Sequence, residues 1–169
     1  NLAEAQLVIN DEEFSVTVLT KSKCMGGSWE YQKIAIDPRN MKHNWCSGET
    51  SPVVLLPQDF VSPKKKDLLV GIINGREPKK IVDGKKVYGK FRPGLILYDP
   101  ETGEVPWIAP EFLFEDPDAR TITFSSDFVR KGKKYGILYA HVNDSFIRAY
   151  KLNSSKIKSA PICPITFPL

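Results

Sequence analysis

Two carboxylates stand where the chain could perform acid–base chemistry. Glu49 lies in the turn sequence Cys46-Ser-Gly-Glu-Thr-Ser-Pro52, directly before an apolar run, and Asp127 interrupts an apolar run between Ser126 and Phe128. General acid–base catalysis needs one group that donates a proton to the leaving group and another that accepts a proton from the nucleophile. We take Glu49 and Asp127 as the candidate catalytic residues. The structural alternatives are a solvated turn residue and a hydrogen-bonded strand-end aspartate.

Cationic and aromatic side chains supply candidate substrate ligands. Arg92 and Arg120 can each bind phosphate or a sugar carboxylate through paired hydrogen bonds, although both also suit surface ion pairs. Trp107 belongs to an aromatic set that offers stacking platforms for sugar rings and whose other role is core packing. The sequence has no Walker loop, Rossmann fingerprint or serine-nucleophile elbow, so we expect no cofactor.

Short β-strands joined by turns must position these side chains. Three β-rich runs near the C-terminal end predict an antiparallel meander: residues 121–129, 135–142 and 145–152. In the first run, the alternation places Ile122, Phe124 and Phe128 on one face of the sheet. Further strands are expected at residues 14–20, 29–36, 51–56, 68–74 and 94–98, while the first ten residues suit either a helix or a strand.

This pattern predicts an all-β fold built of antiparallel meanders. A loose repeat of apolar strand, polar turn, apolar strand and proline-bearing crossing recurs around residues 53–74, 94–114 and 121–152. Its spacing of roughly 40 residues is compatible with propeller blades. We therefore expect blades of a partial β-propeller, with a β-sandwich or barrel as the alternative. Residues 1–169 then form a single all-β domain or part of a larger propeller.

Composition and cysteine content limit the class of protein. The chain has 169 residues, of which 41% are hydrophobic and 26% charged, as in soluble globular proteins. No apolar run approaches the roughly 20 residues that span a bilayer, so no membrane association is expected. Three free thiols, Cys24, Cys46 and Cys163, are favoured over a Cys24–Cys46 bridge, and a cytoplasmic location over secretion. The spacing of His43 and Cys46 fits no zinc pattern, and no metal site is expected.

Lysine clusters raise a second hypothesis, a non-catalytic binding module. The clusters lie at residues 64–66, 79–80, 85–86 and 131–134, all in predicted turns. On one face they would form a basic patch for nucleic acid or an acidic polysaccharide. Spread around the surface they would only aid solubility. The second arrangement is favoured. The net charge of +4 does not by itself imply nucleic acid, which is not the expected partner.

A family resemblance rests on three motifs between residues 91 and 152. They are Arg92-Pro-Gly94 with Leu97 and Asp99, then Ile108-Ala-Pro110-Glu111, and finally Tyr139-Ala-His-Val-Asn-Asp144-Ser-Phe-Ile147-Arg-Ala149. Together they resemble the closing blades of five-bladed β-propeller glycosidases, above all the β-mannoside phosphorylases of glycoside hydrolase family 130, over about residues 50–157. The resemblance implies a carbohydrate-active protein that cleaves or binds a β-linked glycan, with glycoside hydrolase or glycoside phosphorylase as the activity.

The resemblance also suggests roles for individual residues. Arg92 and Asp144 match the family's sugar-binding motifs, although Asp144 equally suits an ordinary hairpin turn. His141 stands where the family has a small residue and would lie on the pocket floor. Asn74 stands where the family carries a histidine that helps to hold phosphate. Because an incomplete propeller leaves strand edges open, we also expect pairing with another chain or a second copy.

Overall fold

The computed structural model describes residues 1–61 and 67–158. Residues 64–66 and Cys163, which carry two of the expectations above, lie outside these ranges. The described residues form antiparallel sheets with very little helix, which confirms the all-β prediction. They form neither a closed barrel nor a closed propeller. No helix in this part of the chain is long and apolar enough to cross a membrane.

Within residues 1–61 and 67–158, twelve strands make three main sheets and one small hairpin. The first sheet contains β1 (Leu2–Ile9), β2 (Glu12–Lys21) and β3 (Glu30–Ile36), in that order. The second has the order β4 (Glu49–Leu55), β5 (Leu69–Arg76), β8 (Phe91–Tyr98) and β9 (Trp107–Phe112). The third contains β10 (Thr123–Arg130), β11 (Tyr135–Val142) and β12 (Phe146–Asn153). The hairpin is β6 (Lys80–Val82) with β7 (Lys85–Val87), and the short helices are η1 (Pro38–Asn40), η2 (Asn44–Cys46) and α1 (Ser154–Lys158).

Local turn chemistry explains several of these hairpins. Ile9 pairs with Glu12 across the two residues Asn10 and Asp11, and both of these have positive φ. The same holds for Asp83-Gly84 between β6 and β7. Two consecutive positive φ angles define the type I′ turn, whose twist matches that of the flanking strands and which favours Asn, Asp and Gly. The first ten residues are accordingly a strand and a turn rather than a helix.

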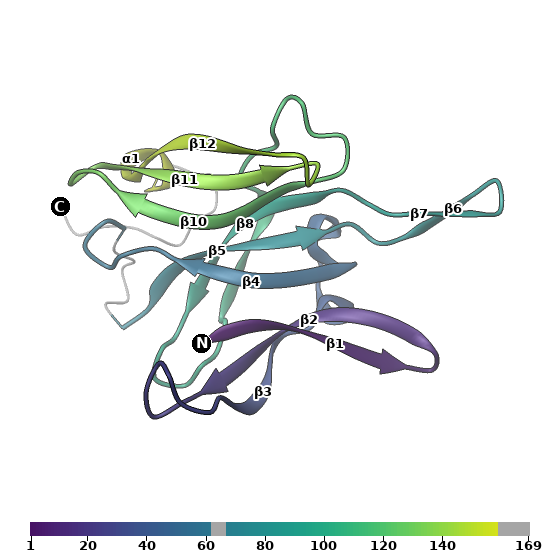
Figure 1. Ribbon diagram of the computed structural model, residues 1–169, viewed down its shortest axis with the longest axis horizontal. Helices are drawn as coiled ribbons and strands as arrows, with labels where there is room; N and C mark the ends of the chain where they lie inside the picture. Colours follow the sequence, from purple (N-terminus) through teal and green to yellow (C-terminus); the bar gives the residue numbers. More distant parts are fainter. Residues whose placement is uncertain (62–66, 159–169) are drawn as a thin grey trace.

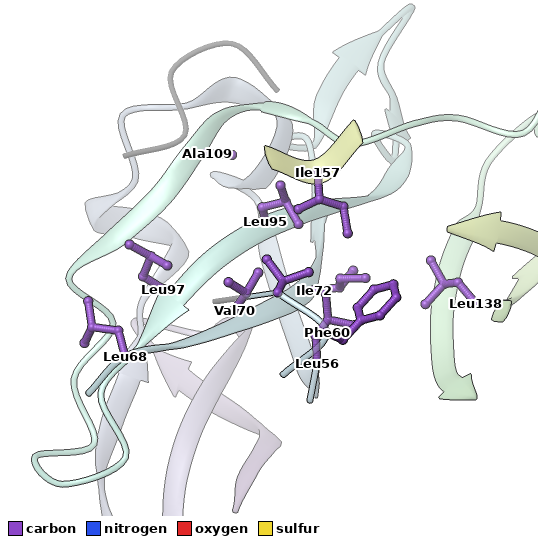
Figure 2. Close-up of a cluster of buried hydrophobic side chains, with 11 residues drawn as sticks. Leu56, Phe60, Leu68, Val70, Ile72, Leu95, Leu97, Ala109, Leu138 and Ile157 are labelled. Atoms are coloured by element: carbon purple, nitrogen blue, oxygen red, sulfur yellow. The ribbon is translucent and has the colours of Figure 1, made fainter. Parts of the chain in front are cut away.

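The sheets stack face to face, with the four-stranded sheet in the middle (Figure 1). Val70 and Ile72 of β5, with Leu95 of β8, belong to a core cluster shared with Leu138 of the third sheet (Figure 2). Ile73 of β5 belongs to the second cluster, which includes residues of the first sheet. Both faces of the middle sheet are therefore buried, as the continuous apolar run of β5 indicates.

A row of buried polar side chains links the three sheets. The Thr17 hydroxyl of β2 donates to the backbone oxygen of Ser51 on β4 at 2.9 Å. The amide nitrogen of Asn74 on β5 donates to the backbone oxygen of Ser125 on β10 at 2.9 Å, and its amide oxygen accepts from the Ser125 backbone N–H at 2.6 Å. Asn74 and Thr17 are fully buried. These bonds fix how the sheets lie against one another, because buried polar groups need partners.

One face assignment is wrong. The meander itself is confirmed, but Phe124 pairs with His141 whereas Phe128 pairs with Leu138, three residues away on β11. A β-bulge between Ser125 and Asp127 inserts one extra residue and reverses the alternation. Phe124 and Phe128 therefore point to opposite faces of the third sheet.

Candidate functional site

One hollow at the surface is a groove at one end of the sheets. It lies between the β1–β2 turn and the β6–β7 hairpin, which both project to the right in Figure 1. Its floor comes from the segments around Glu49 and Lys79, and its volume is about 540 Å³. We call it the hairpin groove. Three segments that are distant in sequence line the hairpin groove, so no local sequence motif could predict it.

Glu49, the first residue of β4, lies in the floor of the hairpin groove. Its carboxylate accepts a hydrogen bond from Arg76 Nη1 at 3.0 Å, and Lys79 Nζ lies 4.0 Å from its other oxygen. The side chain is only 13% exposed. Two cations therefore already engage this carboxylate, which suits a hydrogen-bond acceptor better than a proton donor.

Arg76 is held between two aromatic rings. Its guanidinium carbon lies 4.2 Å from the centre of the Phe91 ring and 5.3 Å from that of Tyr88. Such cation–π contacts fix the orientation of the guanidinium group. Tyr88 itself is 53% exposed and lines the hairpin groove. The groove thus presents an aromatic side chain beside an ordered ion pair.

Arg92 lies behind the wall of the groove rather than in it. It bonds Glu77, a groove residue, at 2.6 Å and also Glu115, and its guanidinium stacks 4.7 Å from the centre of Phe112. Burial opposes the charge on Arg92, but the two carboxylates outweigh burial and raise its pKa. Hydrogen bonds from Lys90 and Arg92 hold the pKa of Glu115 below its usual range. Arg92 is therefore already neutralised by protein carboxylates.

A second buried charge network joins β12 to the preceding loop. Asp116 accepts hydrogen bonds from Arg148 Nη1 at 2.8 Å and from the Tyr150 hydroxyl. Burial opposes ionisation of Asp116, but these bonds outweigh it and hold its pKa below the ordinary value. Burial and the Asp116 carboxylate raise the pKa of Tyr150. None of these three residues was a predicted site residue.

Arg120 lies in a different hollow, beside the β11–β12 turn. That hollow is shallow and is also lined by Asn143. The Asn143 side-chain oxygen accepts hydrogen bonds from the backbone N–H of Arg120 at 2.8 Å and of Thr121 at 3.1 Å. Asp144 follows in the turn itself with a φ of 53°. Asn143 and Asp144 thus form the β11–β12 turn, and the Asn143 side chain holds the backbone of residues 120 and 121 against it.

The remaining predicted site residues lie elsewhere. Asp127 is exposed on β10, and its Oδ1 accepts from the backbone N–H of Phe128 at 2.7 Å at the bulge. His141 is exposed on β11, with its ring 6.2 Å from that of Phe124. Trp107 is half-buried on β9 and packs against the cluster between the second and third sheets. The structure therefore brings Glu49 and Arg92 near one groove, which Asp127 does not line.

The lysines of the β6–β7 hairpin and those of the β10–β11 turn lie at opposite ends of the molecule (Figure 1). Residues 1–61 and 67–158 contain no group of three His, Cys, Asp or Glu side chains arranged to hold a metal ion. Cys24 and Cys46 are both free thiols, the first exposed and the second buried.

Comparison with known proteins adds no relative: no protein-family model, no curated protein and no solved structure matches the chain.

Proposed function

We propose that this chain is a carbohydrate-binding protein that takes a β-linked glycan in the hairpin groove. The observation that carries the proposal is the half-exposed Tyr88 ring beside the ordered Glu49–Arg76 pair and Lys79. A sugar ring can stack its C–H face on an aromatic ring while its hydroxyls bond nearby charged groups. An open groove of about 540 Å³ has room for such a ligand.

The architecture supports a propeller-like arrangement for this protein. The sheets stack face to face, and the middle one is buried on both sides. Figure 1 shows that β4 and β10, the first strands of the second and third sheets, run in the same direction. Each sheet is then built outward by antiparallel neighbours in chain order. A partial propeller is our proposal for the arrangement of these three sheets as blades.

Binding is better supported than cleavage. Glycoside hydrolysis uses two carboxyl groups about 5 to 10 Å apart, one of them protonated. Arg76 and Lys79 both engage Glu49, and Asp127 does not line the groove. Glu77, which also lines the groove, is bonded to Arg92. Neither Glu49 nor Glu77 is therefore placed as a free acid.

The test is a glycan panel assayed for binding and cleavage, with and without phosphate. We expect a β-linked oligosaccharide to bind, and Tyr88→Ala to weaken it roughly three- to tenfold through loss of stacking. Tyr88→Phe should retain binding. Tyr31→Ala is the matched control, since Tyr31 is 62% exposed on β3 and does not line the groove.

Two results would contradict the proposal. If no glycan binds, or if Tyr88→Ala and Tyr31→Ala behave alike, the hairpin groove is not a sugar site. Cleavage that disappears in Glu49→Gln while binding persists would instead make this protein an enzyme.

A further inference from the structure

The β12 strand is an open edge of the third sheet. In the order β10-β11-β12 it pairs with β11 on one side, and no described strand lies on its other side. It is eight residues long and contains no proline. The short helix α1 follows β12, and its Ile157 packs into the core cluster. Open edges of this length are templates for pairing with another strand.

Several apolar side chains of β12 are exposed, as expected for a strand that pairs with a further strand at this edge. Ile147 is 67% exposed and Phe146 41% exposed, and Ala149 also faces solvent. Arg148, one of the two charged residues of the strand, is held by Asp116 and Asp118. Natural edges are commonly protected by proline or by charged side chains, above all lysine. β12 has no proline, and its exposed Lys151 lies over the Tyr135 ring, 4.9 Å from the ring centre.

We infer that β12 pairs in antiparallel fashion with β12 of a second copy of this chain, across a two-fold axis at Ala149. This register places Ala149 opposite Ala149, Arg148 opposite Tyr150, Ile147 opposite Lys151 and Phe146 opposite Leu152. Like charges never face each other, and an aromatic side chain faces an aliphatic one. Such cross-strand pairs stabilise antiparallel sheets.

Neighbouring registers are less favourable. A two-fold axis one residue earlier places Arg148 opposite Arg148, a like-charge pair. An axis one residue later leaves Phe146 unpaired and places the exposed Ile147 opposite Asn153. The Ala149 register is therefore self-complementary, which is the requirement for a two-fold symmetric contact. The third sheets of the two copies would join into one six-stranded sheet.

This inference is independent of the proposed glycan site, since β12 contributes no residue to the hairpin groove. It is tested by sedimentation velocity over a wide concentration range. We expect the apparent mass of the native protein to rise from 19.1 kDa toward twice that value. An edge contact of this size is a weak one, so the equilibrium should depend on concentration.

Charge variants at the axis test the register. Ala149→Glu and Ala149→Lys each place like charges opposite one another and should raise the dissociation constant roughly fivefold. An equimolar mixture of the two variants places opposite charges there and should restore association. Val8→Glu, a charge at a residue 68% exposed on edge strand β1, is the matched control and should associate like the native protein.

Three results would overturn the inference. The first is a mass of 19.1 kDa at every concentration. The second is native-like association of both Ala149 variants, which would locate the contact on another surface. The third is a mixture that associates no better than either variant alone, which would exclude the Ala149 register.

Discussion

Replacement of Asn74 tests how the second and third sheets are held together. Its side-chain amide donates a hydrogen bond to the backbone oxygen of Ser125 at 2.9 Å and accepts one from the backbone N–H of Ser125 at 2.6 Å. The amide thus bonds Ser125 in the way that the backbone of a neighbouring strand would. Both residues are buried. Asn74→Leu keeps the approximate volume of the side chain but leaves one buried N–H and one buried carbonyl without partners.

The expected loss in the free energy of unfolding follows from those two groups. Each buried polar group left unsatisfied costs about 1–3 kcal/mol, so Asn74→Leu should destabilise the protein by about 3 kcal/mol. For a chain of this size, that corresponds to a fall of about 6–12 °C in Tm. Urea titration followed by the fluorescence of the buried Trp45 measures the change. The m-value should stay constant, since the folded state remains compact.

A hydroxyl deletion on β10, the strand that contains Ser125, provides the control. Ser126 is exposed, and its hydroxyl donates to the backbone oxygen of Tyr139 at 3.3 Å. Ser126→Ala should change the free energy of unfolding by less than about 0.5 kcal/mol. If Asn74→Leu costs no more than this control, the amide does not hold the sheets together and the reasoning fails.

Three further predictions concern packing, acid stability and thiol reactivity. Gly94→Ala should lower the free energy of unfolding by about 2 kcal/mol in urea titrations, because the new methyl group would overlap the Trp45 ring. Folding lowers the pKa of Asp116, so the ionised carboxylate stabilises the folded state at pH values above the unfolded pKa near 3.8. This contribution to the free energy of unfolding is lost as the pH falls below 3.8 through the lower pKa of the folded state. Asp116→Asn should therefore cost about 2 kcal/mol at pH 7 and flatten the loss of stability toward pH 3. Burial raises the pKa of the Cys46 thiol to about 12, so peptide mapping after iodoacetamide treatment should show Cys24 modified at least about tenfold faster.

Each of these has an outcome that would contradict it. Gly94→Ala with native stability would mean that the Trp45 ring can shift. An unchanged pH dependence in Asp116→Asn would show that other carboxylates cause the acid loss. Equal alkylation of the two cysteines would show that Cys46 is accessible.

Alternation and turn residues predicted most strands because they act locally. The runs at residues 29–36, 68–74 and 94–98 became β3, β5 and β8 with small shifts at their ends. The bulge beside Ser126 could not be read in the same way. It depends on pairing with β11 and on the two backbone bonds that Asn74 makes to Ser125. A contact made across two sheets decides the face on which Phe128 lies.

The candidate site was less accessible from sequence. Glu49 was singled out, but the residues that define its surroundings, Arg76 and Tyr88, lie after the strand predicted at residues 68–74, in a stretch for which only lysine-bearing turns were predicted. Their roles arise because the fold brings distant segments together, and the spacing of residues in the sequence does not predict this contact. Arg92 was a candidate ligand for phosphate or a sugar carboxylate, with a surface ion pair as the alternative, and in the structure Glu77 and Glu115 bond its guanidinium group. The sequence contains both acids but gives no sign that they meet Arg92.

The motif Arg92-Pro-Gly94, which carries part of the family resemblance, has a packing explanation in this fold. A side chain at Gly94 would overlap the buried Trp45 ring, and one at Gly75 would meet both that ring and Cys46. Trp45 in turn donates through Nε1 to the backbone oxygen of Ala109 at 3.0 Å. Glycine at positions 75 and 94 is therefore needed for the Trp45 ring to pack against the middle sheet, and this requirement holds for any ligand. Evidence for or against a glycan must therefore come from variants in the hairpin groove, such as Tyr88→Ala, because variants in the motif would report on packing.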